Sequence, residues 1–324
     1  MKMTFQSKLS PLQSLLSLPI DSFAALIGSI ICLSFSPIFI RLSELELGSN
    51  STAFNRFWIA AVGFGILNIL GSLRKHDGGN ENETKENNLK SQTGLLIADG
   101  GLLSIGSILW TWSLTQTSVA NSSIIHNLIP IFTILGGFLV LGKTFDRRFL
   151  LGMWVAIAGV VLLEINDLSS LSLGQQLIGD LAALISALFF GVHPLIAEKL
   201  RTKFDAVTIM TWSSSTSALL LLPVTLFSQE RFFPVSINGW LSVIALAVVG
   251  QMLGIGLWTY CLKKLSSGFA SLVALIVPAL SSFEGWIFFA EPLSFITMSS
   301  FLIILWGMYL AISSTSAMNT ASSN

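Results

Sequence analysis

Four polar side chains lie inside otherwise apolar stretches of this 324-residue chain. They are Arg56 in NRFWIAA, His126 in IIHNLIP, Gln251 in VGQMLG and Glu284 in SSFEGW. An Arg, Lys or Asp at the centre of a lipid-embedded helix costs about 2.5–3.5 kcal/mol. Polar residues that are present despite this cost are candidates for binding a solute or carrying a proton.

Arg56 and Glu284 each allow two interpretations. The Arg56 side chain either extends to the lipid headgroups or faces a central cavity. Glu284 lies about 9 Å from the nearer end of its apolar run, by the rise of a helix. Its carboxyl group either carries a proton or binds a substrate amine, or it forms an ion pair that holds helices together.

His126 and Asn127 lie one turn before Pro130. A proline removes the hydrogen bond to the carbonyl four residues earlier, here that of His126. His126 and Asn127 therefore either bind substrate, with His126 also able to carry a proton, or satisfy a freed backbone group. We predict that Arg56, His126 and Glu284 form one polar layer facing the cavity.

Other candidate residues lie nearer the ends of apolar runs. Aromatic residues there either form an interfacial belt or take part in gating and stacking on substrate: Trp110, Trp112, Trp258 and Tyr260. Gln251 faces the cavity, or its neighbours Gly250 and Gly254 allow close helix packing. We expect His193 at an interface, and Asp99 and Asp180 as caps of helix N-termini.

The composition indicates that lipid surrounds most of the chain. Hydrophobic residues make up 52% and charged residues only 10%, against about 25% charged residues in soluble domains. The net charge is zero, which argues against a nucleic-acid partner because such proteins carry a basic face. The sequence has no phosphate-binding G-x-x-x-x-G-K-[ST] motif and no zinc-type spacing. We therefore expect no metal, no cofactor, no ATP drive and no enzyme activity.

Ten apolar runs approach the roughly 20 residues that a membrane-spanning helix needs. They cover residues 21–41, 52–73, 94–114, 119–141, 148–165, 176–197, 206–227, 238–261, 267–290 and 294–314. With the N-terminus inside, the inner segments hold fourteen of the 17 Lys and Arg residues, the outer segments two, and one lies within a span. This positive-inside bias predicts cytoplasmic segments at residues 1–20 and 315–324. A bacterial plasma membrane is the expected location.

One phrase occurs twice: GSILWTWSL at Gly106–Leu114 and GIGLWTYCL at Gly254–Leu262. The same separation relates Gly159 to Gly307. The sequence therefore predicts two five-helix repeats, residues 21–165 and 176–314, joined by a linker at 166–175. An odd number of spans inverts the second repeat relative to the first, and such inverted repeats are typical of transporters. The predicted fold is thus all-α and integral to the membrane, with ten transmembrane helices.

Four prolines occupy related places in the two repeats, and we expect a helix kink at each: Pro37, Pro130, Pro194 and Pro278.

The chain resembles the drug/metabolite transporter superfamily in its ten spans and in the stretch NRFWIAA with Arg56. The resemblance extends to two paired segments, LIPIFTILGGFLVLGKTF…AIAGVVLL and IVPALSSFEGWIFFAEPL…LWGMYLAI. Within this superfamily, the chain looks like an EamA-type permease from about residue 22 to 314. Glu291 keeps the acid that the pattern places at this turn, whereas Lys143 stands at the matching place in the first repeat. The resemblance implies a secondary transporter, often an exporter, with a cavity lined by spans one to four and six to nine.

We therefore predict an exporter of small organic metabolites, such as amino acids or amphipathic compounds, that works by alternating access. Arg56 is the single basic residue well inside a span, which argues against sugar-phosphate or nucleotide-sugar substrates. The expected partners are a small-molecule solute, membrane lipid and a coupling proton, and a homodimer is left open. The alternatives are a membrane sensor or scaffold, which would normally bring a soluble domain, and a lipid-modifying enzyme, which would need clustered acids or histidines.

Overall fold

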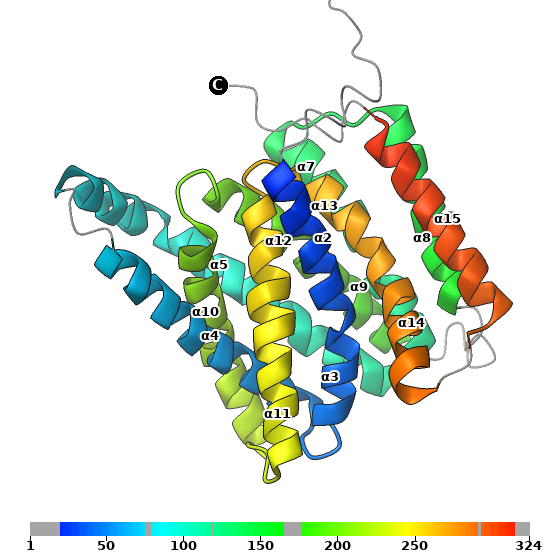
Figure 1. Ribbon diagram of the computed structural model, residues 1–324, viewed down its shortest axis with the longest axis horizontal. Coiled ribbons are helices and arrows are strands. Elements are labelled where there is room, and N and C mark those ends of the chain that lie inside the picture. The colour runs from blue at the N-terminus through cyan, green and yellow to red at the C-terminus, as the bar shows by residue number, and fades with distance from the viewer. Residues whose placement is uncertain (1–19, 75–78, 118, 165–176, 291–292, 315–324) are drawn as a thin grey trace, which may run out of the picture.

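A computed structural model describes residues 20–74, 79–117, 119–164, 177–290 and 293–314. The regular structure of these residues is helical (Figure 1). The predicted linker and C-terminal tail, nearly all of the N-terminal segment, and Glu291 lie outside the described residues. The order is α2 (Ile20–Ser34), α3 (Ser36–Ser43), α4 (Ser49–Arg74), α5 (Gly79–Gln116), α6 (Val119–His126), α7 (Ile129–Leu141), α8 (Arg147–Glu164), α9 (Leu177–Leu200), α10 (Ala206–Phe227), α11 (Ile237–Ala245), η2 (Leu246–Ile255), α12 (Gly256–Cys261), α13 (Ser267–Val273), η3 (Ala274–Ile276), α14 (Val277–Phe289) and α15 (Phe295–Ile312).

Nine segments of the described chain are long and apolar enough to cross a membrane. The remaining predicted span, the fifth at residues 148–165, coincides with α8, an 18-residue helix with Arg147, Arg148 and Glu164 at its ends. Many large apolar side chains point outward; Phe227 and Phe295 are both 86% exposed. Helices satisfy their own backbone groups, which is what a lipid environment requires. The chain is a multi-pass integral membrane protein.

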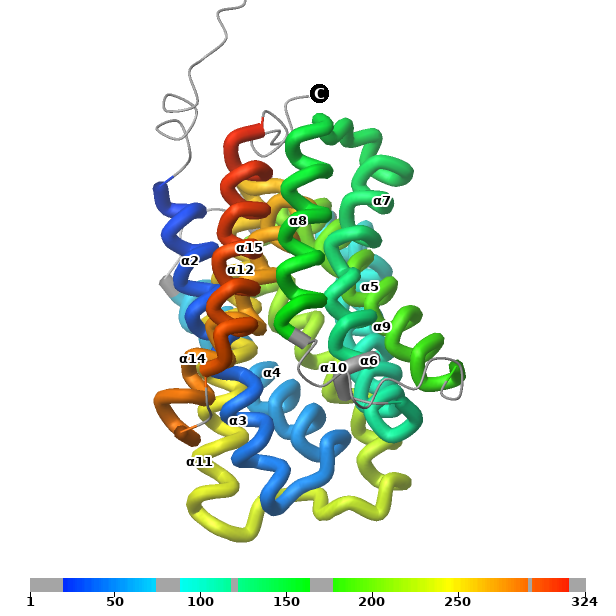
Figure 2. Tube along the Cα trace, turned by 90° about the vertical axis from the view of Figure 1, so that its right-hand side faces the viewer, coloured from blue at the N-terminus to red at the C-terminus, as the bar shows by residue number. Residues whose placement is uncertain are grey.

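The helices α8 and α15 form a tight pair at one edge of the bundle (Figures 1 and 2). A Cβ atom on Gly152 would lie 2.5 Å from the carbonyl oxygen of Gly307. A Cβ atom on Gly307 would lie 2.5 Å from the backbone nitrogen of Ala156. Small residues allow two backbones to approach this closely, a common device where helices pack within lipid.

Three of the long spans are interrupted just before a proline. Phe35 separates α2 from α3, residues 127–128 separate α6 from α7, and the 3₁₀ segment η3 precedes α14. Pro37, Pro130 and Pro278 each occupy the first turn of the following helix, where a missing N–H breaks no helical hydrogen bond. Pro194 instead lies inside α9, which continues without interruption.

A fourth irregularity lies in the span from α11 to α12, where η2 is a ten-residue π-helix. Its carbonyls bond to the amide five residues on, which widens the turn, and such segments are frequent at functional sites. Proline does not cause this one, because Leu246–Ile255 contains none.

Carboxylates tie the loops together at both ends of the bundle. At the end where α3 finishes, Glu46 Oε2 accepts from the Val235 N–H at 3.0 Å, and Glu230 Oε2 accepts from the Ser51 N–H at 2.8 Å. At the opposite end, Glu198 pairs with Lys143 and accepts from the Ser267 N–H at 2.9 Å.

Candidate functional site

Arg56 on α4 meets Gln251 on the π-helix η2. The Arg56 Nε–H donates to Gln251 Oε1 at 2.8 Å. Gln251 is fully buried, and its Nε2 atom has no hydrogen-bond partner among the described residues. The guanidinium group therefore lies against a buried residue of another helix, with an unused amide donor beside it.

Glu284 on α14 meets the interrupted end of α2. The hydroxyl of Ser34, the last residue of α2, donates to Glu284 Oε1 at 2.6 Å, and the hydroxyl of Ser281 donates to the Ser34 carbonyl at 2.7 Å. The second carboxyl oxygen, Glu284 Oε2, is buried and has no partner among the described residues. None of the ion pairs found among those residues involves Glu284.

Ser36 links these two contacts across the break between α2 and α3. A Cβ atom on Gly250, the neighbour of Gln251, would lie 2.7 Å from Ser36 Oγ, and this buried hydroxyl also has no partner in the described chain. We call the set that joins α4, η2, α3, α2 and α14 the polar row: Arg56, Gln251, Ser36, Ser34 and Glu284. Irregular backbone with inward polar groups is how many transporters build their binding sites.

His126 belongs to a separate aromatic group. Its ring stacks on Trp110 with centroids 4.8 Å apart and meets the Phe190 ring edge-on at 5.1 Å. His126 Nδ1 and Trp110 Nε1 are both buried without partners among the described residues. Arg56 and Glu284 are thus connected through intermediate residues of the polar row, whereas His126 contacts aromatic rings from α5 and α9.

Asn127, predicted either to face substrate or to satisfy the backbone, forms a local contact. Its side-chain Nδ2 donates to the Ser123 carbonyl at 2.8 Å, at the point where α6 gives way to α7. Among the aromatic residues, Trp112 and Tyr260 are 45% and 42% exposed, as expected of an interfacial belt, while Trp258 is only 7% exposed.

Two residues were placed wrongly from the sequence. His193 was expected at an interface and Asp99 at a helix N-terminus, but both are buried, with His193 Nδ1 2.8 Å from Asp99 Oδ1. Asp99 lies mid-helix because α5 begins at Gly79, well before the apolar run. The neighbouring Gly100 packs against α10, since its Cβ would lie 2.4 Å from the Ser213 carbonyl oxygen. No local sequence signal places Asp99 beside His193, because the two residues are 94 positions apart.

The sequence matches the profile of the EamA-like transporter family over residues 22–165 and again over 177–313. The chain belongs to the EamA-like transporter family. As a member it is a membrane transporter that interacts with a small-molecule solute.

Curated relatives of this EamA-like protein carry the description of uncharacterized transporters. One from Archaeoglobus fulgidus is 24% identical over 202 residues, which is 61% of this chain and 68% of the relative. Another, from Methanothermobacter thermautotrophicus, is 26% identical over 247 residues, 71% of this chain and 68% of the relative. A solved crystal structure superposes with a TM-score of 0.76 at 16% identity, covering 92% of this chain and 99% of that one. At this identity the likeness concerns the fold alone.

Proposed function

We propose that this EamA-like protein is a secondary transporter of small zwitterionic metabolites of the amino-acid type, working as an exporter by alternating access. The observation that carries this proposal is the polar row, in which Arg56 bonds to Gln251 on η2 and Glu284 accepts from Ser34 at the interrupted span α2–α3. Ten spans in two inverted five-helix repeats, with both termini in the cytoplasm, complete the proposed architecture.

Opposite charges in the row suit the two ends of a zwitterion. The planar guanidinium of Arg56 matches the geometry of a carboxylate, and the unpartnered Gln251 Nε2 supplies a second donor beside it. Glu284 Oε2, also unpartnered, would accept from the substrate ammonium group. A solute of this class would satisfy polar atoms that are otherwise buried at a cost of about 1–3 kcal/mol each.

Glu284 would also couple transport to protons. A carboxyl group that holds either a proton or a substrate amine, but not both, makes the two cargoes compete for one site. Exchange of substrate for protons then follows without a further energy source. His126, in its stack with Trp110, would act near the predicted outer ends of spans three and four, either in substrate contact or in proton transfer.

The interrupted spans would act as the moving parts. Pro37, Pro130 and Pro278 each begin a helix that follows a break, and few backbone hydrogen bonds need to change for the two segments to reorient there. Because the halves are proposed to be inverted copies, exchanging their roles interconverts outward-open and inward-open states.

The test is uptake by purified protein in liposomes, using a pool of radiolabelled amino acids and an imposed pH gradient. We expect saturable uptake by the wild type and at least a tenfold decrease in Arg56→Gln and Glu284→Gln, since hydrogen bonds to charged groups contribute about 1.5–3 kcal/mol and 1.4 kcal/mol corresponds to tenfold. Arg148→Gln and Glu44→Gln, both exposed, are the matched controls and should transport like the wild type. Equal uptake by all five proteins would refute the proposed site.

A further inference from the structure

We infer that the buried Asp99–His193 pair, covered by Trp258, is a second proton-binding site, which receives or releases the coupling proton at the membrane face opposite Glu284. This inference rests on the proposed transport function. It concerns residues outside the polar row and the His126 group.

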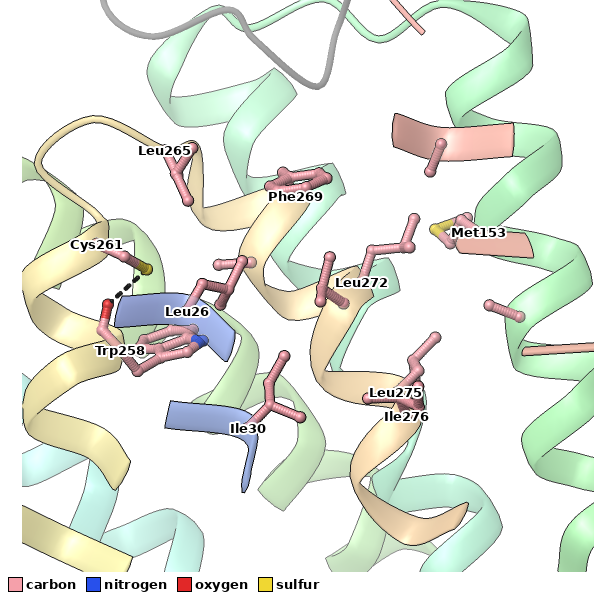
Figure 3. Close-up of a cluster of buried hydrophobic side chains, with 14 of the residues drawn as sticks. Leu26, Ile30, Met153, Trp258, Cys261, Leu265, Phe269, Leu272, Leu275 and Ile276 are labelled. Carbon is pink, nitrogen blue, oxygen red and sulfur yellow. Dashed lines mark hydrogen bonds between the residues drawn. The ribbon is translucent and has the colours of Figure 1, made fainter. Parts of the chain in front are cut away.

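The pair joins two of the most closely packed helices of the bundle, α5 and α9. His193 Nδ1 lies 2.8 Å from Asp99 Oδ1, with side chains 5% and 0% exposed. Trp258 covers the imidazole, with ring centroids 6.0 Å apart and planes inclined by 18°. Figure 3 shows the Trp258 ring within the core cluster beside Leu26, so the cover is itself held by packing.

Each residue of the pair has one buried polar atom without a hydrogen bond in the described chain. Asp99 Oδ2 and His193 Nε2 both lack a hydrogen-bond partner among the described residues. With the Nδ1–H donating to Asp99, Nε2 of the neutral imidazole is a bare acceptor. Binding of one proton from water forms an N–H bond at Nε2 and changes the charge of the pair from −1 to 0, and release reverses this.

The surroundings of the pair can accommodate the positive charge of an imidazolium. The Asp99 carboxylate at hydrogen-bond distance attracts an imidazolium, and the face of the Trp258 indole favours a cation stacked on it. A purely structural hydrogen bond between helices would need neither a carboxylate nor an aromatic cover.

Charged groups on the neighbouring elements are engaged elsewhere. On and just after α9, Asp180 accepts from Thr117 at 2.6 Å, Glu198 pairs with Lys143, Lys199 is exposed, and Arg201 donates to the carbonyls of Phe204, Thr259 and Tyr260.

On the other packed helices the pattern is the same. Arg56 on α4 bonds to Gln251, and His126 on α6 stacks on Trp110. On α12, the Tyr260 hydroxyl donates to Asp21, and the Cys261 thiol donates to the Trp258 carbonyl at 3.0 Å. On α5 itself Lys90 is exposed near the start, and α7, α10 and α13 contain no Asp, Glu, His, Lys or Arg. None of these described groups pairs with Asp99, so in our proposal a proton on the imidazole supplies its counter-charge.

The pair and Glu284 lie toward opposite ends of the bundle. His193 lies seven residues before the end of α9, and that end adjoins the start of α13 through the bond from the Ser267 N–H to Glu198. Glu284 lies near the far end of α14, which continues from α13. An alternating-access carrier needs a protonatable group reachable from each side, and these two sites meet that requirement.

The test compares Asp99→Asn and His193→Gln with Ser186→Ala. Ser186 on α9 donates to the Gly106 carbonyl on α5 at 2.8 Å, so Ser186→Ala removes a buried bond between the same helices without removing a titratable group. In liposomes, we measure gradient-free counterflow and pH-driven accumulation of the labelled amino-acid pool. We expect Asp99→Asn and His193→Gln to keep counterflow within about threefold of wild type but to lose pH-driven accumulation at least tenfold. Ser186→Ala should retain both.

A second readout does not depend on transport. A protonated imidazole stacked on an indole quenches its fluorescence, so tryptophan emission of the purified protein should change in a step as the pH is varied. We expect this step in the wild type, Ser186→Ala and His126→Gln, and its loss in Asp99→Asn and His193→Gln.

The outcomes separate the two proposals. Absence of counterflow in the wild type would refute the transport function, while the fluorescence titration would still decide whether the pair binds a proton. Retained pH drive in Asp99→Asn and His193→Gln, an equal loss of counterflow and pH drive in them, or an unchanged titration would overturn the second proton site.

Discussion

Unpartnered polar atoms mark the candidate site at the scale of single residues. Gln251 Nε2, Ser36 Oγ and Glu284 Oε2 are buried without hydrogen bonds in the described chain, although each such atom costs about 1–3 kcal/mol. A folded protein avoids this cost unless a ligand or proton satisfies the atoms in part of a working cycle. In our proposal, these free donors and acceptors are the complement of a solute with both an acidic and a basic group.

Arg56→Lys should separate charge from shape at this site. Lysine keeps the positive charge but lacks the planar fork that binds a carboxylate through two parallel hydrogen bonds. We expect uptake of the labelled amino-acid pool to fall at least tenfold in liposomes, with thermal unfolding in detergent close to that of wild type. Uptake equal to wild type would show that Arg56 acts as a simple point charge.

Glu46 should make the loops at the α3 end sensitive to acid. Hydrogen bonds from the Ser236 hydroxyl and from the Val235 and Ser236 N–H groups lower the pKa of Glu46 below its usual 4.5. A lowered pKa means that the contact stabilises fully above the unfolded value and weakens as the pH falls through the folded value. Hydrogen exchange of the Val235 and Ser236 amides, corrected for the intrinsic rate, should therefore accelerate below about pH 4.5. In Glu46→Gln the corrected rate should not change with pH; the same acceleration there would contradict the assignment.

At the scale of elements, composition and proline placement predicted more than side-chain chemistry did. Apolar runs located the spans because a helix in lipid must be continuously apolar over its length. Pro37, Pro130 and Pro278 stand in the first turns after breaks because the ring cannot donate within a helix. The π-helix η2 has no such local signal, so the orientation of Gln251 toward Arg56 depends on how α4 and η2 pack. Asp99 and His193, 94 residues apart, likewise meet only through tertiary packing.

Gly152→Ala tests the tight contact between α8 and α15. The added methyl group would lie 2.5 Å from the Gly307 carbonyl oxygen and 2.7 Å from the Ala311 nitrogen, and backbone atoms cannot move aside cheaply. We expect a loss of about 1–3 kcal/mol, the usual range for overpacking, seen as a lower thermal unfolding temperature in detergent.

Gly65→Ala is the matched control for this substitution. A Cβ atom at Gly65 would meet nothing within 4 Å, and alanine is favoured over glycine in a helix by up to about 1 kcal/mol. Its unfolding temperature should equal or exceed that of wild type. An unfolding temperature of Gly152→Ala equal to or above that of wild type would contradict the close packing of α8 on α15.

At the scale of the whole molecule, we propose that the chain consists of two five-helix repeats with opposite orientations in the membrane. The family profile matches twice along the chain, and Gly159 and Gly307, related by the repeat, both lie in the contact between α8 and α15. Inversion would place the Trp110 and Trp258 aromatic stacks toward opposite membrane faces.

Sidedness can be tested by labelling single introduced cysteines in intact cells with a membrane-impermeant maleimide. Lys203 and Val235 lie in the loops before and after α10, and both are exposed. We expect Val235→Cys to react in intact cells and Lys203→Cys to react only after permeabilisation, with the unsubstituted protein as the blank. Reaction of Lys203→Cys alone in intact cells would reverse the proposed orientation.

The most direct measurement of the central claim is counterflow in sealed liposomes without any ion gradient. Vesicles are preloaded with an unlabelled amino-acid mixture, and entry of the labelled pool is followed for the wild type and for Glu284→Gln. If the protein is a solute carrier, the labelled pool should enter with a transient, saturable overshoot that requires the internal load. If Glu284 couples transport to protons, Glu284→Gln should keep a reduced overshoot but lose the accumulation that a pH gradient drives. Entry that ignores the internal load, or no entry with folded protein, would contradict transport of this class of solute by alternating access.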